Sequence, residues 1–271
     1  MGSISLIIGI VAGLALVVYG IGMQNIGNFI DMPSVYITIG GTFSGIIASF
    51  PLRVLAGVPK HLKIAFFGPK YDAMKYIDTI VEFAQIARKS GLLALEEKAN
   101  QEQDPFLKES ILLIVDAVDA DKIRDMLNAN LDNMMARHEE AISIYEKGAA
   151  LGPAFGMIGT LIGLINMLKA LDVTNSEASS ALGEGMSVAL ITTFYGSMLA
   201  NVVFAPIANQ LKTKNDEEYL CRSIILEGIL SIQSGENPKY IREKLVSLLE
   251  RRIAERAAKK GAANSESAGG E

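Results

Sequence analysis

Charged residues are confined to particular regions of this 271-residue chain, although Asp, Glu, Lys and Arg make up 20% of it. Four long stretches contain none of them and no His: Ile4 to Gly22, Ser34 to Leu52, Gly148 to Leu168, and Gly185 to Leu211. Each reaches the roughly 18 to 20 residues that an α-helix needs to cross the hydrocarbon core of a bilayer. The pattern predicts an all-α integral membrane protein with four transmembrane helices.

The third stretch is unusually rich in small residues. Its glycines are Gly148, Gly152, Gly156, Gly159 and Gly163. Each interior Gly costs about 1 kcal/mol of helix propensity relative to Ala, whereas in lipid small residues let helices approach closely. Because this stretch also lacks any group that could hold a proton, we expect its glycine faces to receive a helix from another chain.

Lys and Arg indicate the orientation. Of the 25 basic residues, 13 lie between Arg53 and Lys147, 11 lie between Lys212 and Lys260, and the remaining one is Lys169. Basic residues near the membrane mark the cytoplasmic side, so we expect both termini and the long middle segment inside. The first stretch has no convincing cleavage pattern and is expected to be a retained anchor, not a signal peptide.

The same pattern gives the expected division of the chain. Residues 1–52 hold transmembrane helices 1 and 2 (about 4–22 and 34–52), and 53–147 form a helical cytoplasmic domain. Residues 148–210 hold transmembrane helices 3 and 4 (about 149–168 and 186–208). Residues 211–258 form C-terminal cytoplasmic helices, and 259–271 form a disordered tail. Ser90-Gly91 is expected to end one cytoplasmic helix, and Asn237 to cap another that begins at Pro238. The helix of the middle segment is expected to run nearly without a break across Gly148.

Several chemistries find no support in the residues. Cys221 is the only cysteine, which fits a reducing compartment and excludes an intrachain disulfide. His61 and His138 lie far apart without a second ligand at metal spacing, and the Gly-Glu-Gly at 183–185 is expected to be a short connection entering a helix. With no nucleotide-binding or nucleophile motif, we expect no enzyme, no cofactor and no resident metal. Acidic and basic residues nearly balance in the middle segment, so neither nucleic acid nor a polybasic lipid anchor is indicated.

The predicted spans also lack the ionisable residues that usually mark ion pathways. Their polar groups are hydroxyls, notably Thr160, Thr192 and Thr193. Any titrating carboxylate must therefore come from another polypeptide. Pro153 and Pro206 each remove a helix hydrogen bond and make hinges possible, although each residue alone has an equally ordinary structural explanation. Asp31, the only charge in the outer turn, is expected to be a cap; the alternative is the mouth of an ion path.

Three motifs resemble the flagellar motor stator A-subunit family, MotA/PomA. They are ARKSGLLALEE from Ala87 to Glu97, GPAFGMIGTLIGLINML from Gly152 to Leu168, and ALITTFYGSMLANVVFAPIA from Ala189 to Ala208. The resemblance extends from Gly2 to about Arg252. It implies five A-subunits around a dimeric, peptidoglycan-anchored B-subunit (MotB/PomB-like) in the bacterial inner membrane. The essential Asp on the single span of that B-subunit would supply the missing carboxylate and bind the coupling ion.

The resemblance also assigns roles to residues. Pro153 and Pro206 match the prolines that couple ion passage to movement, and Thr160 and Thr193 match hydroxyl positions beside the ion site. Thr at position 160 is typical of the sodium-driven branch, so a transient Na⁺ near these threonines is favoured over H⁺. The charged positions that engage the rotor switch protein (FliG-like) are matched by Arg88, Lys89, Glu96 and Glu97; the alternative is a solvated face of mixed charge.

Three other functions fit these residues less well than the stator interpretation. An ExbB/TolQ-type energiser also surrounds a partner's Asp-bearing helix, but it typically has three spans and lacks the charged region around Arg88 and Glu96. A self-sufficient transporter is disfavoured because the spans carry no charge. A membrane scaffold without ion coupling is disfavoured by the motifs. The expected partners are thus the B-subunit, further copies of the chain, the rotor switch protein and membrane lipid.

Overall fold

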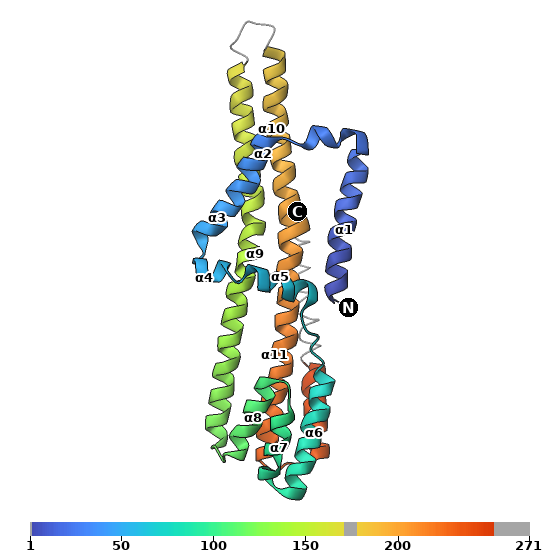
Figure 1. Ribbon diagram of the computed structural model, residues 1–271, viewed down its shortest axis with the longest axis vertical. Coiled ribbons are helices and arrows are strands. Elements are labelled where there is room, and N and C mark those ends of the chain that lie inside the picture. Colours follow the sequence, from blue (N-terminus) through green and yellow to red (C-terminus); the bar gives the residue numbers. More distant parts are fainter. Residues whose placement is uncertain (1, 171–177, 252–271) are drawn as a thin grey trace. The chain divides into compact units, whose positions relative to one another are not determined.

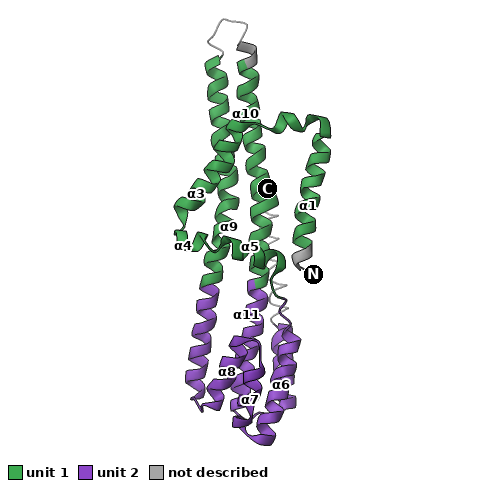
Figure 2. Ribbon diagram, in the orientation of Figure 1, with its two compact units in different colours: residues 1–69, 137–214 green, residues 70–136, 215–271 purple. Residues whose placement is uncertain are grey.

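The computed structural model describes residues 2–170 and 178–251, and every regular element in these two ranges is helical (Figure 1). The expected all-α fold class is therefore confirmed. The chain divides into two compact units, one formed by 1–69 with 137–214 and the other by 70–136 with 215–271, so that each unit combines two separate segments (Figure 2). Compactness does not test where a membrane would end, so the predicted membrane boundaries remain predictions. The predicted tail at 259–271 lies outside the described residues.

Four parts of the chain have the length and apolarity of membrane spans when each bent helix pair counts as one. The ranges Ala120–Ala170 and Ala181–Gln233 qualify alone. Ser5–Ile21 qualifies together with Met23–Phe29, across a bend of 97°, and Met32–Ser49 together with Leu52–Phe67, across a bend of 120°. The four predicted spans are consistent with this arrangement.

The first unit contains the apolar helices. Its elements are α1 (Gly2–Ile21), the 3₁₀ helix η1 (Met23–Phe29), α2 (Met32–Ser34), the π-helical η2 (Val35–Gly40), α3 (Gly41–Ser49), α4 (Leu52–Leu55), α5 (Val58–Phe67), part of α9 (Ala120–Ala170), α10 (Ala178–Met198), the π-helical η4 (Leu199–Phe204) and the start of α11 (Ala205–Gln233). Asp31 is the N-cap of α2, because its side chain accepts a 2.8 Å hydrogen bond from Ser34 N. The cap interpretation of Asp31 is thus the one that the structure supports.

The near-continuity predicted across Gly148 is confirmed, because α9 is one helix of 51 residues. A second long helix runs through α10, η4 and α11. Within it, η4 ends two residues before Pro206, whose ring would clash with the carbonyl of Val202 in a regular α-helix. A π turn carries an extra residue and accommodates that ring without ending the helix.

One local prediction in this unit is wrong. The Gly-Glu-Gly segment at 183–185 was expected to be a connection, but it lies inside α10. A Cβ atom on Gly185 would lie 2.8 Å from the carbonyl oxygen of Gly163 on α9. Glycine is needed there because the two helices approach closely. From the sequence alone, a glycine at a helix contact cannot be told from a glycine in a loop.

The second unit is a small helical domain. It contains α6 (Ala73–Ser90), η3 (Leu92–Ala94), α7 (Leu95–Gln101), α8 (Pro105–Val115), the first part of α9, most of α11 and a helix at 238–251. Its core contains Ile77, Ile80, Leu107, Ile111 and Ile224. As predicted, α6 ends at Ser90, where Gly91 has φ +83°. The Asn237 cap is also confirmed, since its Oδ1 accepts a 3.0 Å bond from Lys239 N.

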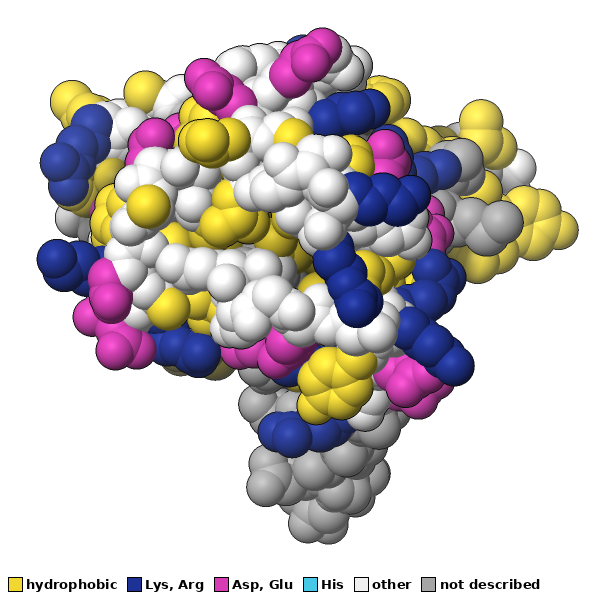
Figure 3. All heavy atoms as spheres, turned by 90° about the horizontal axis from the view of Figure 1, so that it is seen from below, with side chains coloured by type: hydrophobic (Ala, Val, Ile, Leu, Met, Phe, Trp, Pro, Cys, Tyr) yellow, Lys and Arg dark blue, Asp and Glu magenta, His cyan; other side chains and the backbone are white. Residues whose placement is uncertain are grey.

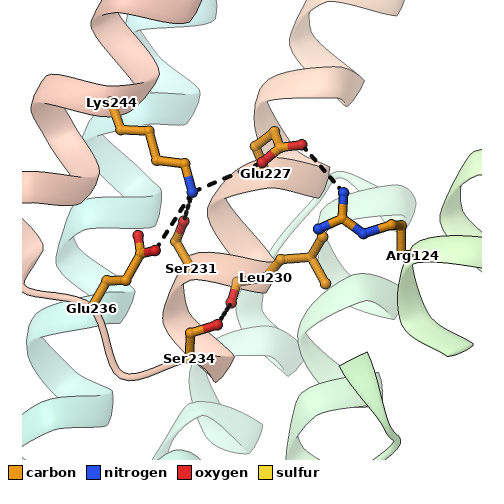
Figure 4. A network of polar contacts seen from close by, with 7 residues as sticks. All are labelled: Arg124, Glu227, Leu230, Ser231, Ser234, Glu236 and Lys244. Atoms are coloured by element: carbon orange, nitrogen blue, oxygen red, sulfur yellow. Dashed lines mark hydrogen bonds and ion pairs between the residues drawn. The ribbon is translucent and has the colours of Figure 1, made fainter. Parts of the chain in front are cut away.

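A polar network fixes the turn that joins α11 to the last helix (Figure 4). Lys244 Nζ donates a 2.9 Å hydrogen bond to Ser231 Oγ and lies 3.6 Å from a Glu236 carboxylate oxygen. Glu227 lies between Lys244 and Arg124, at 3.9 and 3.8 Å. The network ties α9, α11 and the helix at 238–251 together within the second unit.

Candidate functional site

The glycines of α9 contact α10 of the same chain. A Cβ atom on Gly152 would lie 2.8 Å from the carbonyl oxygen of Gly196, and one on Gly156 would lie 3.0 Å from that of Thr192. A Cβ atom on Gly159 would overlap the side chain of Thr192. The prediction that these faces receive a helix from another chain is therefore wrong. Small residues instead bring the backbones of two helices of one chain into direct contact.

This close approach brings the predicted hydroxyls together. Thr160 Oγ1 on α9 lies 2.6 Å from Thr193 Oγ1 on α10. The hydroxyls of Thr160, Thr192 and Thr193 all point at the carbonyl oxygen of Ala189, at 3.0, 3.1 and 3.2 Å. Three side-chain oxygens and one carbonyl oxygen therefore meet at one level of the helix pair, and we call these four residues the threonine cluster.

The three threonines face different surroundings. Thr192 is fully buried, and its side chain lies against Gly159 of α9. Thr160 is half-buried, and Thr193 is exposed. The outer face around them is apolar and open in the single chain, since Met157, Leu161 and Leu190 are each about 60% exposed. The Thr160–Thr193 pair therefore lies on a face that a neighbouring helix can cover. Thr192 lies on the buried side and reaches the same carbonyl oxygen of Ala189.

A third helix reaches this cluster, and the sequence did not identify its residue as part of the site. Thr38 Oγ1, within the π-helical η2, donates a 3.3 Å hydrogen bond to the carbonyl oxygen of Thr192. Thr42 Oγ1 in turn donates a 2.6 Å bond to the carbonyl oxygen of Thr38. Ser34, Thr38 and Thr42 are all fully buried. Their spacing of four residues places them on one helix face, and that is the signal from which this contact could have been anticipated.

A polar stripe continues from the cluster along α10 and into η4. Thr193, Ser197 and Asn201 follow one another at four-residue intervals, and all three are exposed. Asn201 Nδ2 donates a 3.0 Å bond to the carbonyl oxygen of Ser197. The stripe offers neutral oxygen and amide groups. Between Met186 and Gln210 the sequence contains no Asp, Glu, Lys, Arg or His, so a cation at this face would need its counter-charge from another chain.

The two predicted hinge prolines lie at opposite ends of one helix contact. Pro153 is inside α9, two turns before Thr160, and its missing N–H leaves the carbonyl of Ala149 without its helical donor. Pro206 follows η4. Between them, a Cβ atom on Gly148 would lie 2.6 Å from the ring of Phe204, so the two helices touch closely at that level. Each long helix thus has a weakened hydrogen-bond ladder beside this contact.

The four predicted rotor residues are exposed and lie on α6 and α7 of the second unit, which the short η3 separates. Arg88 and Lys89 are in the last turn of α6, and Glu96 and Glu97 are in the first turn of α7. These positions match the helix dipoles, which favour cations at C-termini and anions at N-termini. Among the described residues no ion pair involves any of the four, whereas their neighbour Lys98 lies 3.7 Å from Glu82. Figure 3 shows Lys and Arg interspersed with Asp and Glu over the face seen from below.

The fold and this site define a class: an all-helical membrane protein whose spans present hydroxyls on an open helix face and carry no charge of their own. Residues 98–224 match the model of the MotA/TolQ/ExbB proton channel family. Motility protein A of Borreliella burgdorferi is 40% identical over 89% of this chain and 91% of its own length. Chemotaxis protein PomA of Vibrio alginolyticus is 36% identical over 90% of this chain and 94% of its own length.

Solved structures agree with these relatives. The structure of the flagellar MotAB stator complex from Bacillus subtilis contains a chain that matches with a TM-score of 0.81 and 30% identity, covering 93% of this chain and 98% of that one. Relatives above 30% identity that are covered almost end to end show the family directly. The chain belongs to the motility protein A family, the A-subunits of flagellar stators.

Proposed function

We propose that this chain surrounds a B-type subunit in the bacterial inner membrane and couples the flow of H⁺ or Na⁺ to torque on the rotor switch protein. The observation that carries the proposal is the Thr160–Thr193 pair, two hydroxyls 2.6 Å apart on an open apolar helix face. Hydroxyls can contribute ligand oxygens to a passing ion but cannot supply its counter-charge. A carboxylate on the single membrane helix of the B-subunit would supply it.

The partner and the assembly follow from the family. Solved relatives are MotAB complexes, from Bacillus subtilis and from C. jejuni. A B-subunit helix that packs on the exposed residues Met157, Leu161 and Leu190 would cover apolar surface that is open in the single chain. The expected assembly is five copies around a B-subunit dimer, a number that rests on the family resemblance.

Sodium is favoured as the coupling ion. Thr160 supplies a hydroxyl at the position where proton-driven relatives often have Ala, and in this structure that hydroxyl is part of the threonine cluster. Na⁺ is a hard cation that prefers oxygen ligands, whereas a proton needs only the partner's carboxylate. The ion is the transported species, and the proposed function requires no permanently bound metal or cofactor.

The experiment varies sodium and the proton gradient separately. Swimming speed of cells carrying this chain and its B-subunit is measured over a range of sodium concentrations, then with a protonophore at fixed sodium. Sodium coupling predicts a speed that saturates with sodium and survives the protonophore. Proton coupling predicts the opposite pair of results. Cells that swim equally well without this chain would overturn the stator function itself.

Transmission to the rotor would use the two long helices. Movement at the threonine cluster would pass along α9 and along the helix of α10, η4 and α11, with Pro153 and Pro206 as the compliant points. Arg88, Lys89, Glu96 and Glu97 would then engage charges of the rotor switch protein. Exposed pairs of this kind are each worth only about 0 to 1 kcal/mol, which allows contacts to form and break during stepping.

The runner-up function, an ExbB/TolQ-type energiser, shares the broad family model. The relatives named motility protein A and PomA favour the stator, because they are covered over 91% and 94% of their lengths. We expect both termini and the domain between spans 2 and 3 to be cytoplasmic, as the distribution of Lys and Arg indicates. Membrane lipid would surround the outer faces of the spans.

A further inference from the structure

The segment after span 2 changes direction where that span ends. The helix from Met32 ends at Ser49, Phe50 is extended, and Pro51 precedes α4. The following helices α4 and α5 are bent by 120° from the span. Met32–Ser49 has 18 residues, which at 1.5 Å per residue nearly cover a hydrocarbon core of about 30 Å. The bend therefore comes at the depth where such a span would reach the membrane surface.

One face of α5 packs inward, against α9 and α11 of the same unit. Ala65 is fully buried, and Val58, Leu62 and Ile64 pack on a core that includes Ile142, Phe204 and Leu211. Tyr145 Oη donates a long, 3.5 Å bond to the carbonyl oxygen of Val58, and its ring meets that of His61 edge-on. This inner face holds α5 across the two long helices.

The opposite face of α5 is exposed, basic and apolar. Lys60, Lys63 and Phe67 follow at i, i+3 and i+7, which is one helix stripe. All three are exposed, with Phe67 at 76%. In the adjoining α4, Leu52 is also 76% exposed and is followed by the exposed Arg53. We define Leu52, Arg53, Lys60, Lys63 and Phe67 as the basic stripe.

Acidic and basic residues nearly balance over 53–147 as a whole, which is why the composition indicated no lipid anchor, but the positive charge of the basic stripe is uncompensated within its own part of that segment. No Asp or Glu occurs between Asp31 and Asp72, in a chain whose net charge is −5. Among the described residues no ion pair involves Arg53, Lys60 or Lys63, whereas Lys212 of the same unit pairs with Glu146. Burial lowers the pKa of His61, and the nearby Lys60 and His138 lower it further, which favours the neutral ring. The charge therefore resides on the outward-facing residues.

We propose that the basic stripe binds the phosphate groups of anionic lipids in the cytoplasmic leaflet. This proposal rests on the proposed membrane function of the chain. An exposed aromatic and an exposed leucine on the same two helices as three exposed cations match the boundary between headgroups and acyl chains, where amphipathic basic helices lie. A soluble acidic partner would match the cations but would leave Leu52 and Phe67 against water. The lipid surface satisfies both the charge and the apolar area.

Lipid binding by the basic stripe would hold the helices of the first unit at a fixed depth in the membrane. Because the inner face of α5 packs on α9 and α11, lipids held by its outer face connect the cytoplasmic leaflet to the two helices proposed to transmit movement. Each Lys or Arg near an anionic surface contributes roughly fivefold to binding. Three such residues together give a preference for anionic over zwitterionic lipid on the order of 100-fold before competition among sites is considered.

The test measures lipid retention by the full chain in complex with its B-subunit. The complex is delipidated, titrated with phosphatidylglycerol or phosphatidylcholine, and examined by native mass spectrometry. Three forms are compared: wild type, the triple variant R53Q/K60Q/K63Q, and the control K75Q/K122Q/K239Q, which neutralises three exposed lysines of the second unit. Wild type and control should prefer phosphatidylglycerol by at least about tenfold, and the triple variant should lose most of that preference.

An unchanged preference in the triple variant, or none in wild type, overturns the proposal. If the triple variant does not assemble, R53K/K60R/K63R keeps the charge and should keep the lipid preference; its loss would also overturn the proposal. Inorganic phosphate at matched ionic strength should not displace the lipid, and displacement would assign the stripe to a soluble anion instead. Failure of the proposed function is distinguishable, because it would appear in the sodium and swimming experiment while lipid retention remained.

Discussion

Thr160 Oγ1 lies 2.6 Å from Thr193 Oγ1, and both hydroxyls point at the carbonyl oxygen of Ala189. Thr192 approaches the same oxygen. A carbonyl oxygen has two lone pairs, so it cannot accept from all three hydroxyls while serving its own helix. Thr192 has an alternative acceptor in Val188, at 2.8 Å. Hydroxyls turn freely about their bonds, and so the Thr160–Thr193 pair can direct lone pairs outward toward an ion.

We predict that Thr160→Val weakens the response to the coupling ion and leaves the fold intact. Val keeps the shape of Thr but removes the hydroxyl, and one lost hydrogen bond costs about 0.5–1.5 kcal/mol. If the ion is Na⁺, the sodium concentration for half-maximal swimming speed should rise about tenfold. Thr160→Ser keeps the hydroxyl and should stay near wild type. Equal half-maximal concentrations in all three would show that the hydroxyl is not an ion ligand.

Thr38 should behave as a positioning residue for the same site. Its hydroxyl is buried and donates to the backbone of Thr192, next to Thr193 in sequence. We expect Thr38→Val to shift the half-maximal ion concentration by a few-fold, corresponding to roughly 1 kcal/mol, while the complex still assembles. Thr38→Ser serves as the matched control. A purely structural role would lower assembly or melting temperature without moving the ion response.

Close helix contact predicts a steric sensitivity at Gly152. A Cβ atom there would lie 2.8 Å from the carbonyl oxygen of Gly196, which is backbone and cannot turn away. Gly152→Ala should destabilise the helix pair by about 1–3 kcal/mol, seen as a lower midpoint in thermal unfolding followed by circular dichroism. Gly9, in α1, has no atom near its added Cβ. Gly9→Ala should therefore be neutral or slightly stabilising, and equal losses in both variants would contradict the contact.

Charge reversal should separate rotor engagement from folding. The double variant R88E/E96R reverses two exposed residues without ion pairs in the described structure, and exposed charges contribute at most about 1 kcal/mol to stability. We expect swimming speed to fall below roughly half of wild type, with membrane assembly unchanged. The control K122E/E139K reverses another exposed pair of the chain. If both double variants swim like wild type, Arg88 and Glu96 are only a solvated face.

The sequence predictions succeeded where the structure depends on residues that are close together in the chain. Absent charge located the apolar helices, and Gly91 and Asn237 fixed helix ends, because caps and stops act within a few residues. The end of α8 at Val115 has no such local signal, because the residue with positive φ after it is Ala117, at +55°, and alanine does not indicate a turn. No local pattern shows that a glycine face packs on α10.

The site shows the same division between local and long-range information. Composition identified Thr160, Thr192 and Thr193 as the available hydroxyls, and the structure brings them to one carbonyl oxygen. The contact between Thr38 and Thr192 spans 154 residues of sequence and was not predicted. The roles of the charged residues and prolines come from the family resemblance, because exposed charge and a helix proline each have an ordinary structural explanation.

The last prediction concerns Pro153, the proposed compliant point of α9. Its ring occupies the place of a backbone N–H, so the helix lacks one hydrogen bond beside the Gly148–Phe204 contact. Pro153→Ala restores that bond and favours a stiffer, straighter helix by about 3 kcal/mol. If bending at this position couples ion passage to movement, the variant should assemble with the B-subunit yet produce no torque, measured as rotation of tethered cells. Pro105→Ala is the matched control, because Pro105 begins α8, where no helix hydrogen bond is missing. Normal rotation in Pro153→Ala would show that α9 transmits movement as a rigid rod, and the compliant point would then have to be sought at η4 and Pro206.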